Sequence, residues 1–228
     1  MLLPGSGWCR NPSPSALRSA VPLLCTETYQ AARTRVRGTG VIASSSGVLL
    51  TAAHVIQEAR FNCTLTVMIP DDEWSRFRQL HAFLVSDCRL LPALDLAACQ
   101  IHPAESKKDW AWLRPAAIRT RTAPAGEAVW ITAFTGWGRL PIVRSGQIQG
   151  RQRYQRNDGC YCDFATDIPV EEGMSGSPLI SMEGEVIGIL TLAGRGRFRG
   201  VSFGTSLAEA AVFLKGEGIS AEATSTGK

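Results

Sequence analysis

The feature that most constrains the fold is a succession of short apolar segments, separated from one another by glycine, proline, asparagine or aspartate. Segments of this length that recur along a chain are typical of antiparallel strands in barrels or sandwiches, because those residues reverse the chain between strands. The clearest segments are residues 20–24, 40–43, 47–51, 63–69, 128–132, 178–181 and 186–191. The sequence therefore predicts an all-β protein.

Helical periodicity is clear in only one place, near the end of the chain. From Ser206 to Leu214 the apolar residues fall on one helical face, and Ser206 with Glu209 has the spacing of a capping box. We expect a short C-terminal helix there, followed by a disordered tail over residues 216–228. The stretch 102–126 contains three prolines and is expected to be a surface linker between two strand-rich halves.

The composition argues against several classes of protein. Of the 228 residues, 45% are hydrophobic and 19% are charged, which is ordinary for a globular domain. No apolar run approaches the roughly 18 residues that a membrane-spanning helix needs, so we expect no membrane contact. The net charge of +4 comes mostly from scattered arginines. We expect Arg195, Arg197 and Arg199 to form a solvated loop, and no nucleic-acid partner.

The N-terminal segment and the cysteines bear on compartment and metal binding. Residues 1–18 have no clean signal-peptide core and are expected to be a disordered lead, with a transit peptide as the alternative. Seven cysteines, an odd number, favour free thiols over a disulfide framework and an intracellular location, although the compartment stays open. Cys160 and Cys162 have no second pair to complete a zinc site, and in a strand both thiols would share one face of a core. We expect no metal and no cofactor.

Two short patterns in the first half carry residue types suited to acid–base catalysis. In the segment 51–55 an apolar strand runs into His54, which is flanked by small residues, unlike His81 and His102. Histidine suits a general base because it titrates near neutrality. Asp95 lies within an apolar stretch, where a carboxylate is costly unless it is paired. Asp95 is either a turn residue or the acceptor of the Nδ1–H of His54.

The third pattern is the glycine-rich segment 172–179, which contains Ser175. A cluster of this composition is usually only a turn. Here Gly173 and Gly176 permit backbone conformations that expose the serine hydroxyl and allow a substrate to approach closely. The N–H groups of Gly173 and Ser175 can then converge on one point, as an oxyanion hole requires.

The order His, Asp, Ser is the chymotrypsin order, distinct from the orders in subtilisin and the α/β-hydrolases. Together the patterns resemble the trypsin-like serine peptidases, most closely the branch that includes HtrA-type proteases and glutamyl endopeptidases. The matching segments are Gly38-Thr39-Gly40-Val41-Ile42, Thr51-Ala52-Ala53-His54-Val55, Asp95-Leu96-Ala97, Thr166-Asp167, Gly173-x-Ser175-Gly176-x-Pro178, Gly188-Ile189 and Phe203-Gly204.

This resemblance implies two six-stranded antiparallel barrels of the chymotrypsin type, over residues 19–115 and 116–215, with no PDZ domain after the second. It also implies a serine endopeptidase that acts on polypeptide substrates. His54, Asp95 and Ser175 would be its triad, and Gly173 with Ser175 its oxyanion hole. The oligomeric state stays open.

The resemblance has departures that affect control and specificity. Met174 stands where many relatives have Asn or Asp, so no ion pair with a freed N-terminus can activate the enzyme, and Ser177 replaces a glycine. The specificity pocket would be formed by Pro169, Thr191, Leu192, Ala193 and Phe203. Because Pro169 is not an acid, selection of Arg or Lys is not expected. A small or medium apolar P1 residue is favoured, although the arginine loop could instead attract acidic substrates.

Two rival interpretations place other functions on the same fold. A non-enzymatic, protease-like module that binds peptides would be expected to have lost part of the triad, whereas all three residue types are present. A cysteine peptidase is disfavoured because the nucleophile position is Ser175.

Overall fold

The computed structural model describes residues 18–27, 34–59, 63–72, 74, 78–104, 107–136, 140–151, 154–155, 161–194 and 199–219. Its strands are β1 (Ala20–Glu27), β2 (Thr34–Ile42), β3 (Val48–Ala52), β4 (Cys63–Pro70), β5 (Leu80–Leu91), β6 (Leu96–Pro103), β7 (Ala128–Ala133), β8 (Ile142–Gly150), β9 (Tyr154–Gln155), β10 (Tyr161–Cys162), β11 (Phe164–Thr166), β12 (Pro178–Ser181), β13 (Val186–Ala193) and β14 (Ser202–Ser206). The helices are α2 (Ala53–Ala59) and α3 (Ala211–Gly216), with 3-10 turns η1 (Pro92–Leu94) and η2 (Lys107–Trp112).

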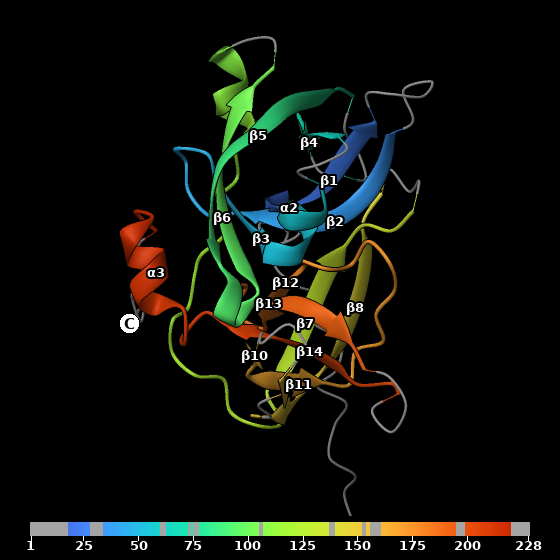
Figure 1. The fold of residues 1–228 in the computed structure, drawn as a ribbon, viewed down its shortest axis with the longest axis vertical. Coiled ribbons are helices and arrows are strands. Elements are labelled where there is room, and N and C mark those ends of the chain that lie inside the picture. Colours follow the sequence, from blue (N-terminus) through green and yellow to red (C-terminus); the bar gives the residue numbers. More distant parts are fainter. Residues whose placement is uncertain are drawn as a thin grey trace, which may run out of the picture.

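The strands form two closed antiparallel barrels, one above the other in Figure 1. The first barrel has the order β1-β2-β3-β6-β5-β4, and the second has the order β11-β14-β13-β12-β7-β8. β9 and β10 form a separate two-stranded sheet. The predicted fold class, two six-stranded chymotrypsin-like barrels with a short C-terminal helix, is confirmed.

Each barrel encloses its own apolar core, because alternate residues of every strand point inward. Leu49, Phe83 and Ile101 are fully buried in the first barrel, and Ile131 and Leu179 are fully buried in the second. A further cluster joins the two barrels to each other and to α3. Its members include Val41, Leu50, Leu96, Ile180, Ile189 and Leu214. The barrels are therefore held together by a continuous apolar interface.

The C-terminal helix starts later than its sequence pattern predicts. Ser206 ends β14, and α3 begins only at Ala211. The capping-box prediction is wrong because the N–H of Ser206 is bonded to the Asp163 carboxylate at 2.6 Å, which keeps this residue in the sheet. The hydroxyl of Ser206 instead accepts the N–H of Ala208 in the turn that follows.

The segment just after α3 is ordered, although the sequence predicts disorder from residue 216. Gly218 has φ +72°, and its N–H donates to Lys215 O while the N–H of Ile219 donates to Leu214 O. This is the Schellman pattern, in which the residue after the left-handed glycine contacts the helix. Ile219 is accordingly buried in the interface cluster, so order extends to residue 219.

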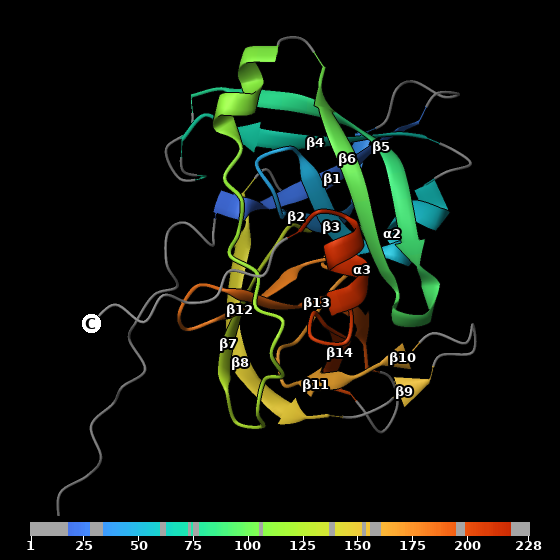
Figure 2. The ribbon, with the colours of Figure 1, turned by 90° about the vertical axis from the view of Figure 1, so that its left-hand side faces the viewer.

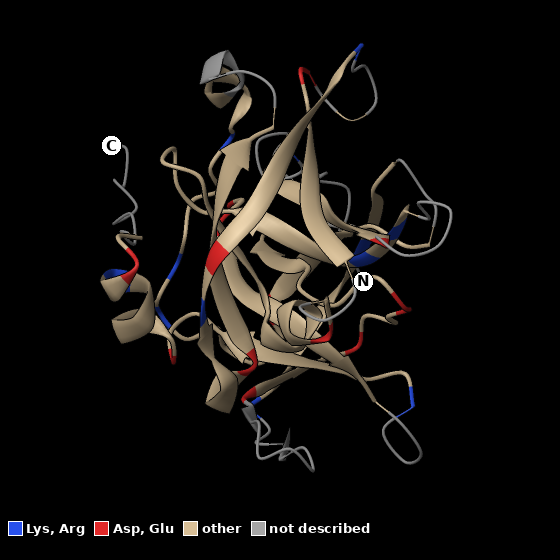
Figure 3. Cartoon of the chain, turned by 45° about the horizontal axis from the view of Figure 1, so that its top comes forward, with Lys and Arg blue, Asp and Glu red and all other residues tan. Residues whose placement is uncertain are grey.

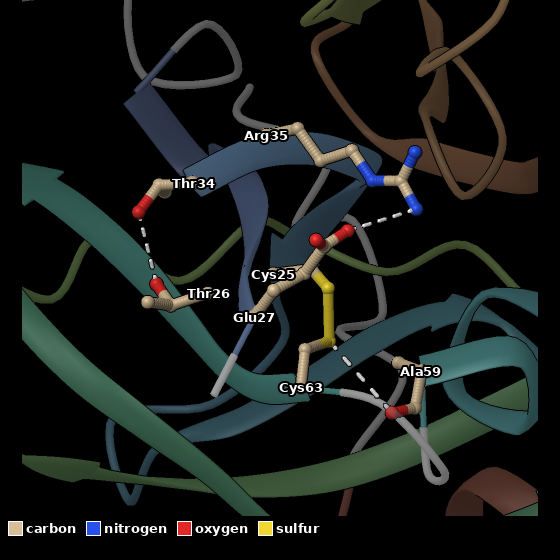
Figure 4. The surroundings of a disulfide bond; sticks show 7 residues. All are labelled: Cys25, Thr26, Glu27, Thr34, Arg35, Ala59 and Cys63. Carbon is tan, nitrogen blue, oxygen red and sulfur yellow. Dashed lines mark hydrogen bonds and ion pairs between the residues drawn. A yellow bond between two sulfur atoms is a disulfide. The ribbon is translucent and has the colours of Figure 1, made fainter. Parts of the chain in front are cut away.

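The expectation of free thiols is wrong for four of the seven cysteines. Cys25 is bonded to Cys63, and Cys88 is bonded to Cys99. Each pair lies on neighbouring strands, β1 with β4 and β5 with β6, which brings the Cα atoms to 5.4 Å and 4.0 Å. The first disulfide is drawn in Figure 4, beside the Arg35–Glu27 ion pair. Strand pairing, which composition does not show, decides which cysteines are bonded.

The remaining cysteines give no test of the metal-site alternative. Cys9 and Cys160 lie outside the described residues, and only the backbone of Cys162 is described. Within the part of the chain that the structure describes, no three side chains gather as a metal site would require. No helix among those residues is long and apolar enough to span a membrane.

The linker between the barrels packs on both of them. In Figure 2 it descends from η2 along one side of the molecule to β7. The Ala116 N–H donates to Ile42 O of the first barrel at 2.8 Å, and the Arg119 N–H donates to Val186 O of the second at 2.9 Å. Between residues 116 and 119 the chain is thus bonded to both barrels. Charged residues of both signs are spread over many elements rather than along one stripe (Figure 3).

Candidate active site

His54 and Asp95 are joined directly in the first barrel. His54 lies in the first turn of α2, which follows β3 without a break, and Asp95 lies between η1 and β6. The Asp95 Oδ2 atom is 2.7 Å from Nδ1 of His54, and Oδ1 accepts the backbone N–H of His54 at 2.9 Å. The carbonyl oxygen of Asp95 accepts the N–H of Ala53 at 3.0 Å. One residue therefore fixes both the ring and the backbone of the histidine.

The local backbone explains how Asp95 reaches this position. Its φ of +50° is left-handed, a conformation that aspartate tolerates better than most residues, and its N–H bonds to Pro92 O at 3.0 Å. The side chain is only 4% exposed, whereas that of His54 is 18% exposed. A buried carboxylate on Nδ1 directs the Nδ1–H tautomer and leaves Nε2 to accept a proton, as a general base must.

The loop around Ser175 depends on two glycines. Gly173 has φ +92° and Gly176 has φ +86°. A Cβ atom on Gly173 would lie 2.8 Å from the carbonyl oxygen of Phe134, so both conformation and space require glycine. Met174 between them is fully buried, which fills the interior with an apolar side chain.

The amide groups of this loop fall into two sets. Three of them donate to the protein, and these bonds are Met174 N–H to Glu171 O (3.1 Å), Gly176 N–H to Leu190 O (2.7 Å) and Ser177 N–H to Met174 O (3.1 Å). The N–H groups of Gly173 and Ser175 donate to none of the described residues. These two amides are the ones expected to bind an oxyanion.

An open cleft of about 450 Å³ brings the candidate residues together. His54 from the first barrel and Gly173 and Ser175 from the second line it, with Asp95 behind the histidine. The remaining lining residues are Arg37, Glu58, Val170, Glu171, Glu172, Leu190, Thr191, Leu192 and Ala193. The candidate general base and the candidate nucleophile residue thus line the same space.

The predicted specificity pocket is only partly at this cleft. Thr191, Leu192 and Ala193 line it, but Pro169 and Phe203 are not among the lining residues. Pro169 is exposed, and its carbonyl accepts a bond from Arg144. Phe203 is 1% exposed and packs against Ala165 and Leu192 on the face of β14 that points away from the barrel core, because its neighbour Gly204 faces Phe164 of that core. Val170 and Leu190 line the cleft in their place.

The cleft is also lined by charged residues that the sequence patterns did not single out. Glu58 follows His54 by one helical turn, a spacing that would have placed it on the same face. Glu171 and Glu172 directly precede Gly173, and Glu171 is paired with Arg144. In the arginine loop, Arg199 is exposed, whereas Arg195 and Arg197 lie outside the described residues.

Comparisons with known proteins agree with the observed fold. Residues 38–189 match the trypsin-like peptidase domain. A probable periplasmic serine endoprotease, DegP-like, from Pseudomonas fluorescens is 30% identical over 171 residues, which cover 73% of this chain and 32% of that protein. The magnetosome formation protease MamE of Magnetospirillum gryphiswaldense is 28% identical over 79% of this chain and 22% of its own length. The chain spans at most about a third of these relatives.

Solved structures share the fold at lower sequence identity. The active form of the Rv3671c protease from M. tuberculosis superposes with a TM-score of 0.68 at 21% identity, covering 96% of this chain and 95% of that one. The HtrA-type protease AlgW with a decapeptide gives a TM-score of 0.65 at 21% identity, covering 89% and 66% of the two chains.

Proposed function

The chain belongs to the trypsin-like peptidase family, and we propose that it is an active serine endopeptidase with His54, Asp95 and Ser175 as its catalytic triad. The observation that carries the proposal is the His54–Asp95 hydrogen bond behind a cleft that Ser175 also lines. The DegP-like relatives are named as serine endoproteases, which supports the same reaction.

In the proposed reaction Ser175 Oγ attacks the carbonyl carbon of the scissile peptide bond while His54 Nε2 takes the hydroxyl proton. Asp95 stabilises the resulting imidazolium through Nδ1–H. The tetrahedral oxyanion accepts bonds from the free N–H groups of Gly173 and Ser175. His54 then gives its proton to the leaving amine, and water hydrolyses the acyl-enzyme by the same steps.

The proposed substrate is a polypeptide with a small or medium apolar P1 residue. Val170, Leu192 and Ala193 present apolar side chains to the cleft, and no arginine or lysine lines it beyond Arg37 among the described residues. The carboxylates of Glu58 and Glu172, which have no ion pair among the described residues, do not favour acidic substrates, which makes the arginine-loop alternative the weaker one. A panel of peptides that differ only at P1 tests this preference.

The activity itself is tested with a denatured protein substrate. The wild-type chain should degrade it, and Ser175→Ala should abolish degradation while its unfolding curve stays unchanged. A Ser175→Ala protein that cleaves at the wild-type rate contradicts the proposal. A folded wild-type chain that binds the substrate without cleaving it would instead identify a protease-like binding module.

No trypsin-style activation step is proposed. Met174 is fully buried next to the nucleophile and cannot pair with a new amino terminus. Its amide and sulfur both contact the backbone of Glu171, so Met174 itself is held without an ion pair.

A further inference from the structure

Thr39 of β2 is fully buried between the two barrels, and all of its polar atoms are bonded. Three of its four bonds cross from the first barrel to the second. The bonds are Thr39 N–H to Ser175 O (2.8 Å), Thr39 Oγ1 to Gly173 O (3.1 Å), Phe134 N–H to Thr39 Oγ1 (2.9 Å) and Thr51 Oγ1 to Thr39 O (2.8 Å). The hydroxyl acts as donor and acceptor at once.

The carbonyl groups that Thr39 holds belong to the two residues whose amides are free. Gly173 and Ser175 each bond to Thr39 through the carbonyl and leave the N–H without a partner among the described residues. The peptide plane after Gly173 is therefore held at both ends, because Thr39 binds its carbonyl and Glu171 O binds its N–H. A glycine rotates at little cost unless its neighbouring planes are fixed.

Strand β2 and the loop around Ser175 are in direct backbone contact. A Cβ atom on Gly38 would lie 2.9 Å from Ser175 O, and one on Gly176 would overlap the carbonyl oxygen of Thr39. Glycines on both sides of the contact thus place the Thr39 hydroxyl within reach of Gly173. Among residues of this size, serine could make the same two bonds, whereas valine could make neither.

We propose that Thr39 is a positioning residue for the oxyanion hole. Its hydroxyl holds the Gly173 carbonyl against the buried strand β2, which fixes the position of the Gly173 backbone and so of the N–H that this residue contributes to the hole. The amide of Gly173 then stays available to the oxyanion without reorganising during the reaction. This inference rests on the proposed peptidase function and gives the first barrel a second contribution to the site besides His54 and Asp95.

The test compares Thr39→Val, Thr39→Cys and Thr39→Ser in the full chain. Loss of one oxyanion-hole donor costs about 10²–10³ in rate, so a donor that is misplaced rather than lost should lower kcat by about 10- to 100-fold in Thr39→Val. KM should stay within about twofold, because substrate binding in the ground state does not use the hole. Thr39→Ser should retain wild-type kcat, and Thr39→Cys should be intermediate because a thiol bonds weakly.

A pair of inhibitors separates positioning from general loss of structure. A peptidyl trifluoromethyl ketone forms an oxyanion on the enzyme, whereas the matching alcohol does not. Thr39→Val should weaken the ketone by the same factor as kcat and leave the alcohol unchanged. The control Thr166→Val removes another buried hydroxyl bond, the one that Thr166 Oγ1 accepts from Ile168 N–H, and should leave the ratio of the two affinities unchanged.

Each outcome decides between the alternatives. Equal loss of ketone and alcohol affinity, or wild-type kcat in Thr39→Val, overturns the inference. If Thr39→Val does not fold, the comparison of folded Thr39→Cys with Thr39→Ser decides instead, and equal kcat in the two overturns it. A wild-type chain without turnover would overturn the proposed function itself, whereas an active wild type that is insensitive to Thr39 overturns only this inference.

Discussion

The two barrels share one architecture but are stabilised by different means. The first carries both disulfides, Cys25–Cys63 and Cys88–Cys99. No disulfide lies in the described part of the second, where the guanidinium of Arg119, 5% exposed, lies between two carboxylates. These are Glu127, at 2.5 Å, and Glu185, at 3.6 Å.

The difference corresponds to what each barrel contributes to the proposed site. The covalent links lie beside the elements that carry side-chain chemistry, since Cys63 contacts the end of α2 and Cys99 is on β6, the strand after Asp95. The second barrel supplies mainly backbone groups, held by hydrogen bonds and by contact with Thr39. We therefore expect catalysis to be lost when either barrel loses its contribution to the site. The stability of each barrel should instead depend on its own interactions.

The largest effect should come from removing one catalytic residue of either barrel. His54→Ala and Ser175→Ala should each lower kcat by about 10⁶-fold, as in the serine protease template. The double variant should be no slower than either single variant, because the two residues act in the same step. Steady-state kinetics on one peptide substrate would show this, and multiplicative losses would mean that the barrels contribute independently.

The second barrel should lose stability when its buried cation is removed. Arg119→Met leaves Glu127 and Glu185 without their counter-charge and should lower the free energy of unfolding by about 3–5 kcal/mol. The pair Arg89–Glu217 provides the control, since the Arg89 side chain is 73% exposed and Arg89→Met should cost less than about 1 kcal/mol. Urea denaturation measures both, and equal losses would contradict the contrast between the barrels.

The first barrel should be sensitive to removal of its disulfides in the order of their loop lengths. Cys25 and Cys63 are 38 residues apart, whereas Cys88 and Cys99 are 11 apart. Loop-closure entropy then predicts losses of about 4 and about 3 kcal/mol for the paired Cys→Ala variants. Thermal unfolding with and without reductant provides the measurement. A wild-type melting temperature that does not respond to reductant would be the contrary result.

The smallest effect concerns one buried carboxylate of the second barrel, and it depends on pH. Burial raises the pKa of Asp163 above its ordinary value, partly offset by the Ser206 N–H bond, with Glu209 raising it further and Arg151 lowering it. The folded state therefore keeps this proton longer, and its stability falls as pH rises from the ordinary carboxyl pKa through the raised one.

Asp163→Asn, which keeps an acceptor for Ser206, should thus gain stability over the wild type as pH rises to neutrality. Below the ordinary carboxyl pKa the two should be equally stable apart from any constant offset. Unfolding curves at acidic and neutral pH test this, and a wild type favoured at neutral pH would rule it out.

The sequence predicted an all-β protein because strand length and turn residues are local properties, and the family resemblance implied the two barrels. It also brought out His54, Asp95 and Ser175, whose settings are readable within a few residues of each. Disulfide pairing could not be read, because Cys25 and Cys63 become neighbours only through the pairing of β1 with β4. The start of α3 was misplaced for the same reason, since Asp163 bonds Ser206 from a distant segment.

The predicted specificity pocket shows most clearly what could not be predicted from the sequence. Thr191–Ala193 reach the cleft, whereas Phe203 is buried against Ala165 and Leu192 and does not line it. In the sequence analysis, Thr39 stood out only as part of the segment Gly38-Thr39-Gly40-Val41-Ile42. Its proposed role depends on three bonds to Phe134, Gly173 and Ser175, which are distant in the sequence, and no local pattern encodes them.

The most direct test of the central claim is labelling with a fluorophosphonate probe, which reacts only with a serine activated by its surroundings. We expect the folded wild-type chain to be labelled at Ser175, as mapped by mass spectrometry. We also expect that His54→Ala and Ser175→Ala are not labelled. Folded wild-type protein that stays unlabelled, or labelling at another serine, would contradict the assignment of Ser175 as a nucleophile activated across the two barrels.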